Sequence, residues 1–479
     1  MGQPLELHPD RLLPPDPTTR EVARRLYTQI RSLPIISPHG HTDPAWFATN
    51  QPFTDAHALI IAPDHYLIRM LYSQGIELPA LGIPTSLSSC ANLADARAAW
   101  RLFANHYYLF AGTPTGYWLN HIFAELFDQT EVLDATTADD YFDAITAALQ
   151  TPDYRPRRII ERFDIEFLAT TESPIDTLEH HQALQAGDWS GRIVTTYRPD
   201  AVVDPEHIDF RAAMNRFAEL TDEDVYGWEG YLQAHRKRRR TFIELGATAS
   251  DHGHPSAATA DLSSREIREL FQRVTTAPAS PADAELFRAQ MLTEMARMSL
   301  EDGLVMQIHP GSSRNHNRWL FDQYGPDKGA DIPLRTDYTN ALRPLLNRFG
   351  NDSNLTIVLF TLDESNYSRE LAPLAGHYPC LRLGPAWWFH DSFDGIRRFR
   401  EQTTETAGFY NTAGFNDDTR ALLSIPARHD MSRRIDAGYL ARLVVEHRLS
   451  EDDAQRIATD LTYNLPKQTY RIDAASNQH

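Results

Sequence analysis

The sequence contains little cysteine and no long apolar run, and both shortages narrow the class of protein. Its 479 residues include two cysteines, Cys90 and Cys380, whose wide separation fits neither a disulfide framework nor zinc-type spacing. Nothing approaches the ~18 apolar residues that a membrane-spanning helix needs, and Met1–Asp10 lacks the apolar core of a secretory signal. We therefore expect a soluble, cytoplasmic protein without a membrane partner.

Positive charge is scarce as well. The chain has 46 lysines and arginines against 65 aspartates and glutamates, which gives a formal net charge of -19. Nucleic acid and anionic membranes would be repelled, so we expect neither as a partner. The basic run at 236–240 is better explained by a solvated helix face or by carboxylate partners. An anionic small substrate stays possible, because buried arginines and a metal can dominate locally.

Short apolar, β-branched runs alternate with helical patterns along the chain. We expect strands at 33–37, 165–170, 192–197, 246–250, 304–308, 355–361, 380–384 and 412–416, of which the fourth and eighth are the weakest. Strands that alternate with helices form parallel sheets through right-handed crossovers. The pattern therefore predicts an α/β fold, a distorted (β/α)8 TIM-like barrel whose sites lie at the carboxyl ends of the strands.

The spacing of these runs is uneven, which predicts insertions. Residues 1–42 form an N-terminal segment and the first strand, and 43–160 is too long for one crossover helix. That stretch has helical periodicity at Asp64–Tyr72 and Leu93–Phe110, so we expect a helical insertion that covers the barrel mouth. The rest of the barrel occupies 161–479, with surface excursions near 204–240 and 255–283.

Two histidines follow the first predicted strand. The string Leu33-Pro-Ile-Ile-Ser-Pro-His-Gly-His41 ends in a His-x-His pair. Residues two apart in a strand point to the same side, so His39 and His41 can direct both imidazoles to one point. Two converging imidazoles are half of a first-row metal site. Such pairs also arise by chance, and the position after a buried strand favours the metal interpretation.

Other predicted strands also end in polar or aromatic side chains. These are Arg198 after the third, Asp251-His-Gly-His254 after the fourth, His309 to Asn315 after the fifth, Trp387 and Trp388 after the seventh, and Asp418-Thr-Arg420 after the eighth. Each alone has an ordinary explanation, such as a helix N-cap or a packed interior residue. Their collection at one end of one barrel predicts a site there.

Longer strings carry a family resemblance. The chain resembles the uronate isomerase (glucuronate isomerase) family of the amidohydrolase superfamily at Asp10–Pro14, Pro34–Asp43, Asp64–Tyr66 with Arg69 and Gly75, Arg198–Asp200, Asp251–Gly253, Gln307–His309, Arg314–Asn315, Gly384–Trp388, Asp418–Arg420 and Arg428–His429. The matches run from about residue 10 to about residue 470. Hydrolytic members of the superfamily often have a carboxylated lysine on strand four and a histidine on strand six. Both are missing here, which argues against a two-metal hydrolytic centre.

The resemblance implies an enzyme of hexuronate catabolism. Such enzymes convert D-glucuronate to D-fructuronate and D-galacturonate to D-tagaturonate, moving a proton between C2 and C1 through a cis-enediol. It also implies one divalent metal, zinc or alternatively manganese, held by His39, His41 and Asp418. His309 is either a further ligand or a hydrogen-bonding neighbour.

The resemblance further implies catalytic roles for four residues. Asp418 is the candidate base, although it could serve only as a ligand. Tyr66 is the candidate proton shuttle, with His65 beside it as orienting group or acid; without the family string, packing within the inserted helix would be the better explanation for Tyr66. Arg420 is expected to bind the C2 and C3 hydroxyls and stabilise the enediolate.

Substrate binding involves a further set of expected residues. Arg198 and Arg314 are candidates for the carboxylate or other sugar contacts, since a guanidinium can bind such groups in a bidentate manner. Trp387 and Trp388 would form an apolar wall, although core packing explains at least one of them. His309 completes this set.

Two other functions stay open at this stage. A metal-dependent hydrolase or deaminase on the same barrel would explain His39, His41 and Asp418, but neither the family strings nor the missing strand-six histidine. A sugar-acid-binding protein without turnover would leave the proton-transfer candidates unexplained. We also expect a homo-oligomer, the usual state of such enzymes.

Overall fold

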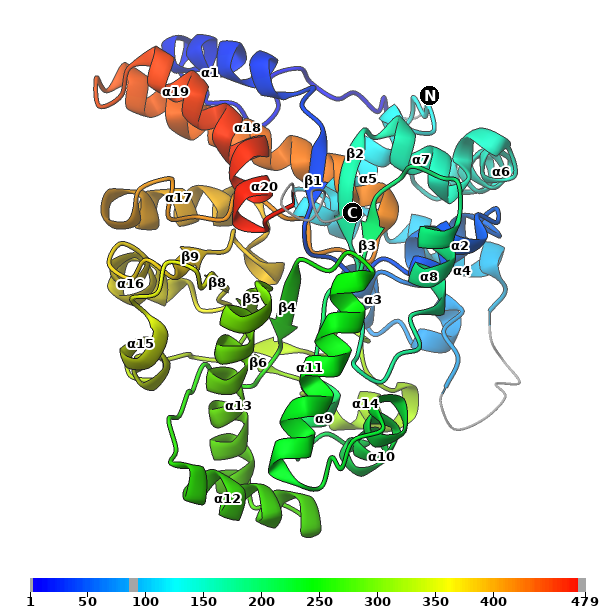
Figure 1. The fold of residues 1–479 in the computed structure, drawn as a ribbon. Coiled ribbons are helices and arrows are strands. Elements are labelled where there is room, and N and C mark those ends of the chain that lie inside the picture. Colours follow the sequence, from blue (N-terminus) through cyan, green and yellow to red (C-terminus); the bar gives the residue numbers. More distant parts are fainter. Residues whose placement is uncertain (1–2, 86–93, 473–479) are drawn as a thin grey trace.

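The computed structural model describes residues 3–85 and 94–472, so Cys90 and the predicted helix start at Leu93 lie outside the described residues. Parallel strands in two sheets form the wall of a barrel (Figure 1). One sheet has the order β1 (Ile35–Ser37), β2 (Ile165–Ala169) and β3 (Ile193–Val194). The other has the order β4 (Ala249–His252), β5 (Val305–Ile308), β8 (Ile357–Leu359) and β9 (Leu381–Leu383).

Backbone contacts between these sheets complete the ring. Tyr197 bridges Ser250 in parallel fashion, which joins the end of β3 to β4, and Leu383 of β9 bridges Thr412. The backbone N–H of His41 donates to the carbonyl of Thr419 at 3.0 Å, which connects the last segment to the first. The distorted (β/α)8 barrel predicted from the strand pattern is therefore confirmed.

Two of the predicted strands were placed incorrectly. The fourth begins at Ala249, because Gly246 has a φ of 89° and ends the preceding helix, so Asp251 and His252 lie within β4. The eighth segment makes an isolated bridge and no regular strand, because Gly414 has a φ of 80° in its middle. A short antiparallel pair after the fifth strand, β6 (Ser312–Ser313) with β7 (Ile332–Pro333), was not predicted.

The barrel interior explains how side chains reach the site. Ile36, Phe167, Val194, Val305 and Val358 form one buried cluster inside the ring. Met306 and Ile308 belong instead to the cluster outside it. Because side chains alternate along a strand, Gln307 and then His309 follow Val305 on the inward side. The inner face of the barrel is thus apolar at its base and polar where the strands end.

Helices surround this ring. They are α1 (Pro17–Ile30), α2 (Pro44–Thr49), α3 (His65–Ser73), α4 (Ala96–Asn105), α5 (Pro114–Glu125), α6 (Ala138–Leu149), α7 (Pro156–Arg162), α8 (Glu179–Ala186), α9 (Asp200–Val203), α10 (Phe210–Thr221), α11 (Trp228–Glu244), α12 (Ser264–Thr276), α13 (Pro281–Asp302), α14 (Arg318–Tyr324), α15 (Arg343–Phe349), α16 (Ala372–Ala375), α17 (Phe393–Ala407), α18 (Ile425–Val445), α19 (Glu451–Thr459) and α20 (Leu465–Thr469). Two of them begin with an aspartate N-cap followed by proline: Asp16 caps α1 and Asp43 caps α2. Among the described residues, no helix combines the length and apolar character that a membrane crossing requires.

The segment between β1 and β2 contains α2 to α7. Trp100, Phe103 and Phe123 are buried in a cluster that also includes Ile35 and Ile165 of the barrel wall. The helices therefore pack directly on the outside of the first two strands. The division of the chain into an insertion at 43–160 and a remaining barrel stays a prediction.

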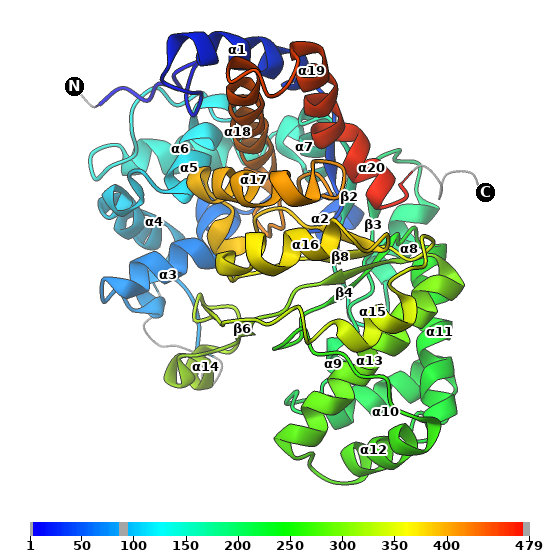
Figure 2. The same ribbon diagram turned by 90° about the vertical axis from the view of Figure 1, so that its left-hand side faces the viewer.

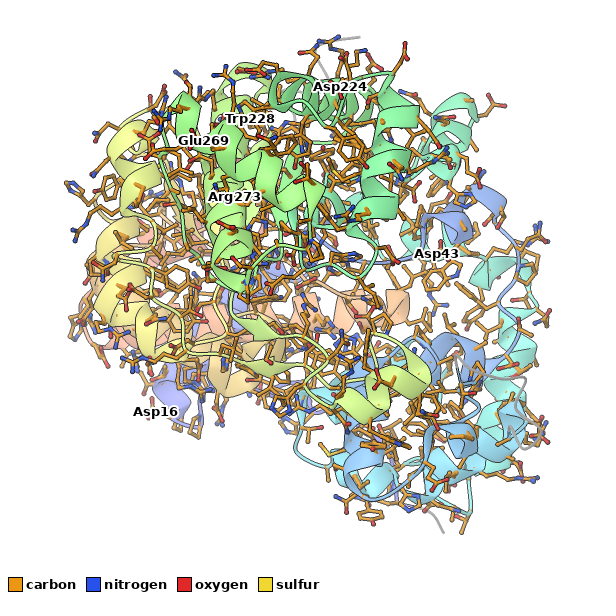
Figure 3. The ribbon with its side chains drawn as sticks, turned by 90° about the horizontal axis from the view of Figure 1, so that it is seen from below. Asp16, Asp43, Asp224, Trp228, Glu269 and Arg273 are labelled. Atoms are coloured by element: carbon orange, nitrogen blue, oxygen red, sulfur yellow. The ribbon has the colours of Figure 1, made fainter. Side chains whose placement is uncertain are left out.

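The excursions near 204–240 and 255–283 are largely helical. Trp228 of α11 packs on Phe271 of α12 at 5.3 Å between ring centroids, and Arg273 pairs with Asp283 at 2.7 Å (Figure 3). A capping box between Ser263 and Glu266 starts α12, where only a surface excursion was predicted.

Three of the five basic residues at 236–240 in α11 pair with carboxylates. Arg236 pairs with Glu301 at 2.7 Å, Lys237 with Glu223 at 2.5 Å, and buried Arg239 with Asp302 at 2.5 Å. Carboxylate partners were one of the two explanations predicted for this run.

The N- and C-terminal helices lie together on one side of the barrel. In both ribbon views α1, α18 and α19 stand side by side (Figures 1 and 2). Asp430 of α18 receives a hydrogen bond from the Tyr27 hydroxyl of α1, and Arg11 and Arg434 pair with it at 2.8 and 2.9 Å. This network fixes α18, whose start follows the last site residues of the chain.

Candidate active site and metal centre

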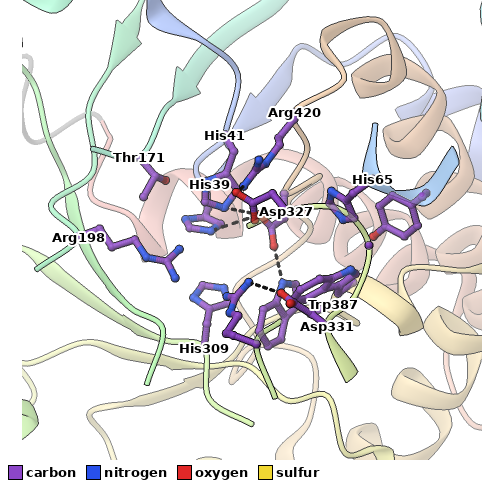
Figure 4. Close-up of a pocket in the computed structure, with 15 residues that line it drawn as sticks. His39, His41, His65, Thr171, Arg198, His309, Asp327, Asp331, Trp387 and Arg420 are labelled. Atoms are coloured by element: carbon purple, nitrogen blue, oxygen red, sulfur yellow. Dashed lines mark hydrogen bonds and ion pairs between the residues drawn. The ribbon is translucent and has the colours of Figure 1, made fainter. Parts of the chain in front are cut away.

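One cavity of about 310 Å³ at the carboxyl ends of the strands brings together every site residue predicted from the sequence (Figure 4). They are His39, His41, His65, Tyr66, Arg198, His309, Arg314, Trp387, Trp388, Asp418 and Arg420. The remaining lining residues, Thr171, Asp327, Gly329 and Asp331, were not predicted. A cavity of this size suits a small polar molecule.

The histidines after β1 face Asp418. The Asp418 Oδ1 atom lies 3.4 Å from His39 Nε2 and 3.1 Å from His41 Nε2. Asp418 has a φ of 41°, a left-handed conformation that is rare for a residue with a side chain, and strain of this kind clusters at functional sites.

A group of possible metal ligands differs in part from the predicted triad. One ligand atom each of His39, His309 and Asp418 lies within 4.8 Å of the others, and His41, although close to Asp418, is not in this group. The geometry thus brings His309 into the group. Two imidazoles and a carboxylate are a donor set that first-row metals bind well.

The charges in this cluster balance one another. Burial lowers the pKa of His39, but the facing carboxylate of Asp418 outweighs it and the pKa rises. Burial would raise the pKa of Asp418, but the imidazoles of His39 and His41 hold it well below 3.8. For His41 burial dominates and the pKa falls. The carboxylate is therefore ionised in the folded protein.

Two of these histidines are held from behind by other strands. His309 Nδ1 lies 2.6 Å from Asp251 Oδ1, and its Nε2 is buried without a hydrogen-bond partner. His39 Nδ1 lies 3.3 Å from the side-chain nitrogen of Gln307, whose oxygen accepts from the Tyr470 hydroxyl at 3.0 Å. Partners behind a ligand fix the orientation of its ring.

His65 and Tyr66 come from the first turn of α3. Asp64 caps this helix and accepts from the Tyr66 N–H at 2.8 Å, which directs the turn toward the barrel. The His65 and Tyr66 rings stack with their centroids 4.7 Å apart, and Cζ of Arg428 lies 5.5 Å from the centroid of the Tyr66 ring. Burial raises the pKa of Tyr66 and lowers that of His65 to about 3, so both are neutral near pH 7.

Each arginine of the cavity already faces a carboxylate. Arg198 lies 3.0 Å from Asp251 and 2.8 Å from Asp200. Farther out, Arg314 pairs with Asp331 at 2.9 Å, and Arg420 pairs with Asp327 at 3.1 Å. These pairs hold the guanidinium groups in place around the cavity.

The contribution of the loop with Asp327 and Asp331 to the site was not predicted from the sequence. Its string Gly325-Pro-Asp-Lys-Gly-Ala-Asp331 predicts a turn, but nothing in it points to a site. Gly329 has a φ of 75°, and a Cβ there would lie 2.6 Å from Arg69 Cβ and 2.9 Å from the His65 carbonyl. The loop therefore lies directly on α3, which explains how residues distant in sequence share one cavity.

The tryptophans combine core packing with contact to the site. Trp387 is buried with Phe360 in the barrel cluster, yet its indole N–H donates to Asp418 Oδ2. Trp388 has a φ of 52° and packs 5.1 Å beneath the Arg314 guanidinium. Core packing explains part of the environment of Trp387, as expected for at least one of the pair.

A family model described as glucuronate isomerase matches residues 17–470. The chain belongs to the glucuronate isomerase family. This match covers the whole barrel, including every residue that lines the cavity.

Relatives and solved structures agree with this family assignment. A uronate isomerase from Phenylobacterium zucineum is 67% identical over 473 residues, which is 99% of this chain and 98% of that protein. The crystal structure of a glucuronate isomerase from Caulobacter crescentus has 62% identity and a TM-score of 0.97, covering 98% of each chain. The uronate isomerase of Thermotoga maritima has 26% identity and a TM-score of 0.90, covering 97% of this chain and 99% of that one.

Membership of the glucuronate isomerase family confirms the isomerase predicted from the motifs. The two alternatives, a hydrolase or deaminase and a non-catalytic binding protein, are not favoured. The barrel strands agree with the departure noted in the sequence, because β4 (Ala249–His252) contains buried Asp251 and no lysine.

Proposed function

We propose that this chain interconverts aldose and ketose hexuronates, D-glucuronate with D-fructuronate and D-galacturonate with D-tagaturonate, in hexuronate catabolism. The observation that carries the proposal is the composition of the 310 Å³ cavity. A carboxylate and metal-type histidines line it together with the Tyr66–His65 pair and three arginines. Proton transfer next to a carbonyl on an anionic sugar needs these three kinds of group.

The reaction moves two protons, and two side chains are assigned to them. Asp418 would take the proton from C2 and return it to C1, so that the base is regenerated. The Tyr66 hydroxyl would give a proton to O1 and receive one from O2, which closes the cycle through the cis-enediol. Asp418 is suited to this as an ionised carboxylate, and Tyr66 as a neutral hydroxyl.

The arginines supply positive charge around the substrate. Arg420 would bind the C2 and C3 hydroxyls and stabilise the enediolate, while Arg198 and Arg314 would contact the carboxylate or other sugar oxygens. His65, neutral because burial lowers its pKa to about 3, would orient the Tyr66 hydroxyl. Trp387 and Trp388 would border the sugar ring.

The residues present fit a divalent metal. His39, His41 and Asp418 would hold it, and the buried Nε2 of His309, which has no hydrogen-bond partner, offers a further ligand. Nitrogen and carboxylate donors favour zinc, with manganese as the alternative. When bound, the ion supplies Lewis acidity and a template for the substrate's carboxylate and neighbouring hydroxyl.

We further propose a cytoplasmic homo-oligomer with small hexuronates as its partners. Closed symmetric assemblies are common among soluble enzymes. Light scattering on the purified chain measures the subunit number, and a monomer at working concentration would contradict this part of the proposal.

The isomerase proposal is tested by incubating the purified, zinc-loaded chain with D-glucuronate or D-galacturonate and following the sugar by NMR. Ketose signals should replace those of the aldose until equilibrium is reached. In deuterated water, label at C1 of the product would show that the transferred proton exchanges with solvent. Unchanged sugar, or a product with a cleaved bond, would overturn the proposal.

A further inference from the structure

Asp251 is a buried carboxylate that contacts two residues of the cavity without lining the cavity itself. It lies on β4, and its side chain has no exposed surface. Oδ1 lies 2.6 Å from His309 Nδ1, and Oδ2 accepts from Arg198 at 3.0 Å. The proposed mechanism assigns it no step.

The contact to His309 determines where the imidazole carries its proton. The Asp251 carboxylate pairs with the Arg198 guanidinium through Oδ2 and lies 2.6 Å from His309 Nδ1 through Oδ1, so it accepts a hydrogen bond from each. His309 Nδ1 must therefore carry the proton. Its Nε2, buried and without a hydrogen-bond partner, then presents a lone pair among the ligand atoms of His39 and Asp418.

We propose that Asp251 is a positioning residue with two effects. It fixes the tautomer of His309 so that this residue serves as an additional metal ligand, and it aligns Arg198 with the substrate. This inference rests on the proposed function for the second effect. The first concerns metal binding alone and is measurable without turnover.

A neighbouring aspartate separates the two effects. Asp200 accepts from Arg198 Nε at 2.8 Å and from the N–H of Gly253 at 3.2 Å, and no contact joins it to His309. Gly253 has no room for a side chain, because a Cβ would lie 2.1 Å from Arg198 Nη2. Asp200 thus supports Arg198 from the other side, and Asp200→Asn is the matched control for Asp251→Asn.

The test measures zinc affinity of metal-free protein by competition with a chromophoric chelator. Asp251→Asn should bind zinc about ten- to a hundredfold more weakly, the usual effect of removing such a supporting group. Asp200→Asn should stay within about a factor of two of the wild type, since Asp200 contacts Arg198 and Gly253 and not His309. Both variants should raise KM for D-glucuronate, because each weakens the support of Arg198.

Two further measurements decide the mechanism. In a His309→Ala background, Asp251→Asn should cause no additional loss of zinc affinity, since the residue that Asp251 acts through is gone. An additional loss equal to that in the wild-type background would overturn the inference. Unchanged zinc affinity in a folded Asp251→Asn variant would also overturn it, whether or not the wild type isomerises uronates.

If Asp251→Asn does not fold, the tautomer is read in the unchanged protein. Imidazole 15N spectra of the metal-free chain with labelled histidine, compared with those of His309→Ala, identify the signals of His309. A proton on Nδ1 supports the inference, and a proton on Nε2 overturns it.

Discussion

The strand ends and the segments that cover them contribute to the same cavity but differ in how their side chains are held. On the strands, His309 and Asp251 have 2% and 0% exposed side chains, and each contacts a neighbouring strand. On the covering side, Asp327 is 40% exposed, and it forms an ion pair with Arg420, which follows the last barrel segment and is 37% exposed. Charged and polar side chains are thus held by buried contacts at the strand ends, whereas the exposed ion pair on the other side can exchange its partners.

This difference matches what each side would do. A metal needs ligands held within a few tenths of an ångström, and buried partners behind the imidazoles of His39 and His309 provide that. A substrate must enter, so the groups that meet it last are better held by weak, exposed pairs. Substitutions that disturb one side at a time should therefore separate the contributions of the two sides.

On the strand side, replacing Asp418 should cause the largest loss of activity. In Asp418→Asn the amide cannot act as a base and is a poor metal ligand, so kcat should fall by a factor on the order of 10²–10⁴. Steady-state kinetics measure this, with circular dichroism as the control for folding. Near-native kcat in a folded variant would remove Asp418 from the chemistry.

On the covering side, Tyr66→Phe should lower kcat by about 10²-fold and leave KM nearly unchanged, because the hydroxyl acts mainly in the transition state. His41→Ala should instead reduce metal occupancy and raise KM. Kinetics and metal analysis of both variants provide the contrast. A wild-type kcat in Tyr66→Phe would show that Tyr66 takes no part in the chemistry and only packs within its helix.

Gly329→Ala should dislodge the loop that lies on α3. Its φ of 75° and the 2.6 Å approach to Arg69 Cβ leave no room for a methyl group, and strain of this kind costs about 1–3 kcal/mol. We expect a higher KM, with zinc affinity unchanged because the strand side is untouched. A loss of zinc affinity would show that the two sides are not independent.

Asp327→Asn should have a smaller and opposite effect. Removing this charge frees Arg420 for the sugar, so KM should fall by up to about fivefold, the range of an exposed ion pair. Asp331→Asn is the control, because Asp331 pairs with Arg314 and not with Arg420. It is also more buried, and it accepts from the Asn315 N–H at 2.7 Å. A raised KM in Asp327→Asn would mean that its carboxylate binds substrate directly.

A final prediction concerns acid stability, and no effect on activity near pH 7 is involved. Burial lowers the pKa of His65 from 6.5 to about 3, so below pH 6.5 the unfolded chain binds a proton that the folded chain excludes. The free energy of unfolding therefore falls as the pH drops from 6.5 toward 3. His65→Asn should lose less stability over this range. Equal pH dependence of Tm in both proteins would contradict the assignment.

Apolar periodicity was sufficient to predict the strands but not their irregular ends. A run such as Leu355–Thr361 is recognisable because a strand buried on both faces is uniformly apolar. Gly246 and Gly414 shifted or broke two strands through positive φ values, which composition alone does not reveal.

The candidate site was predictable to the extent that its residues follow strands or belong to family strings. His39 and His41 stand out after an apolar run, whereas Tyr66 required the resemblance. Asp327 and Asp331 could not be found, because their position depends on a loop packing against a distant helix. Long-range packing of this kind leaves no local pattern in a sequence.

The backbone hydrogen bond between His41 and Thr419 has a consequence for biosynthesis. It joins the first strand to the last segment of the barrel, so two of the proposed metal ligands, His41 and Asp418, come together only after nearly the whole chain has left the ribosome. Contacts between such distant residues form slowly, and partly made chains expose the surfaces that await them. In a nascent chain, His39 and His41 would leave the ribosome long before Asp418 is available to complete a metal site with them.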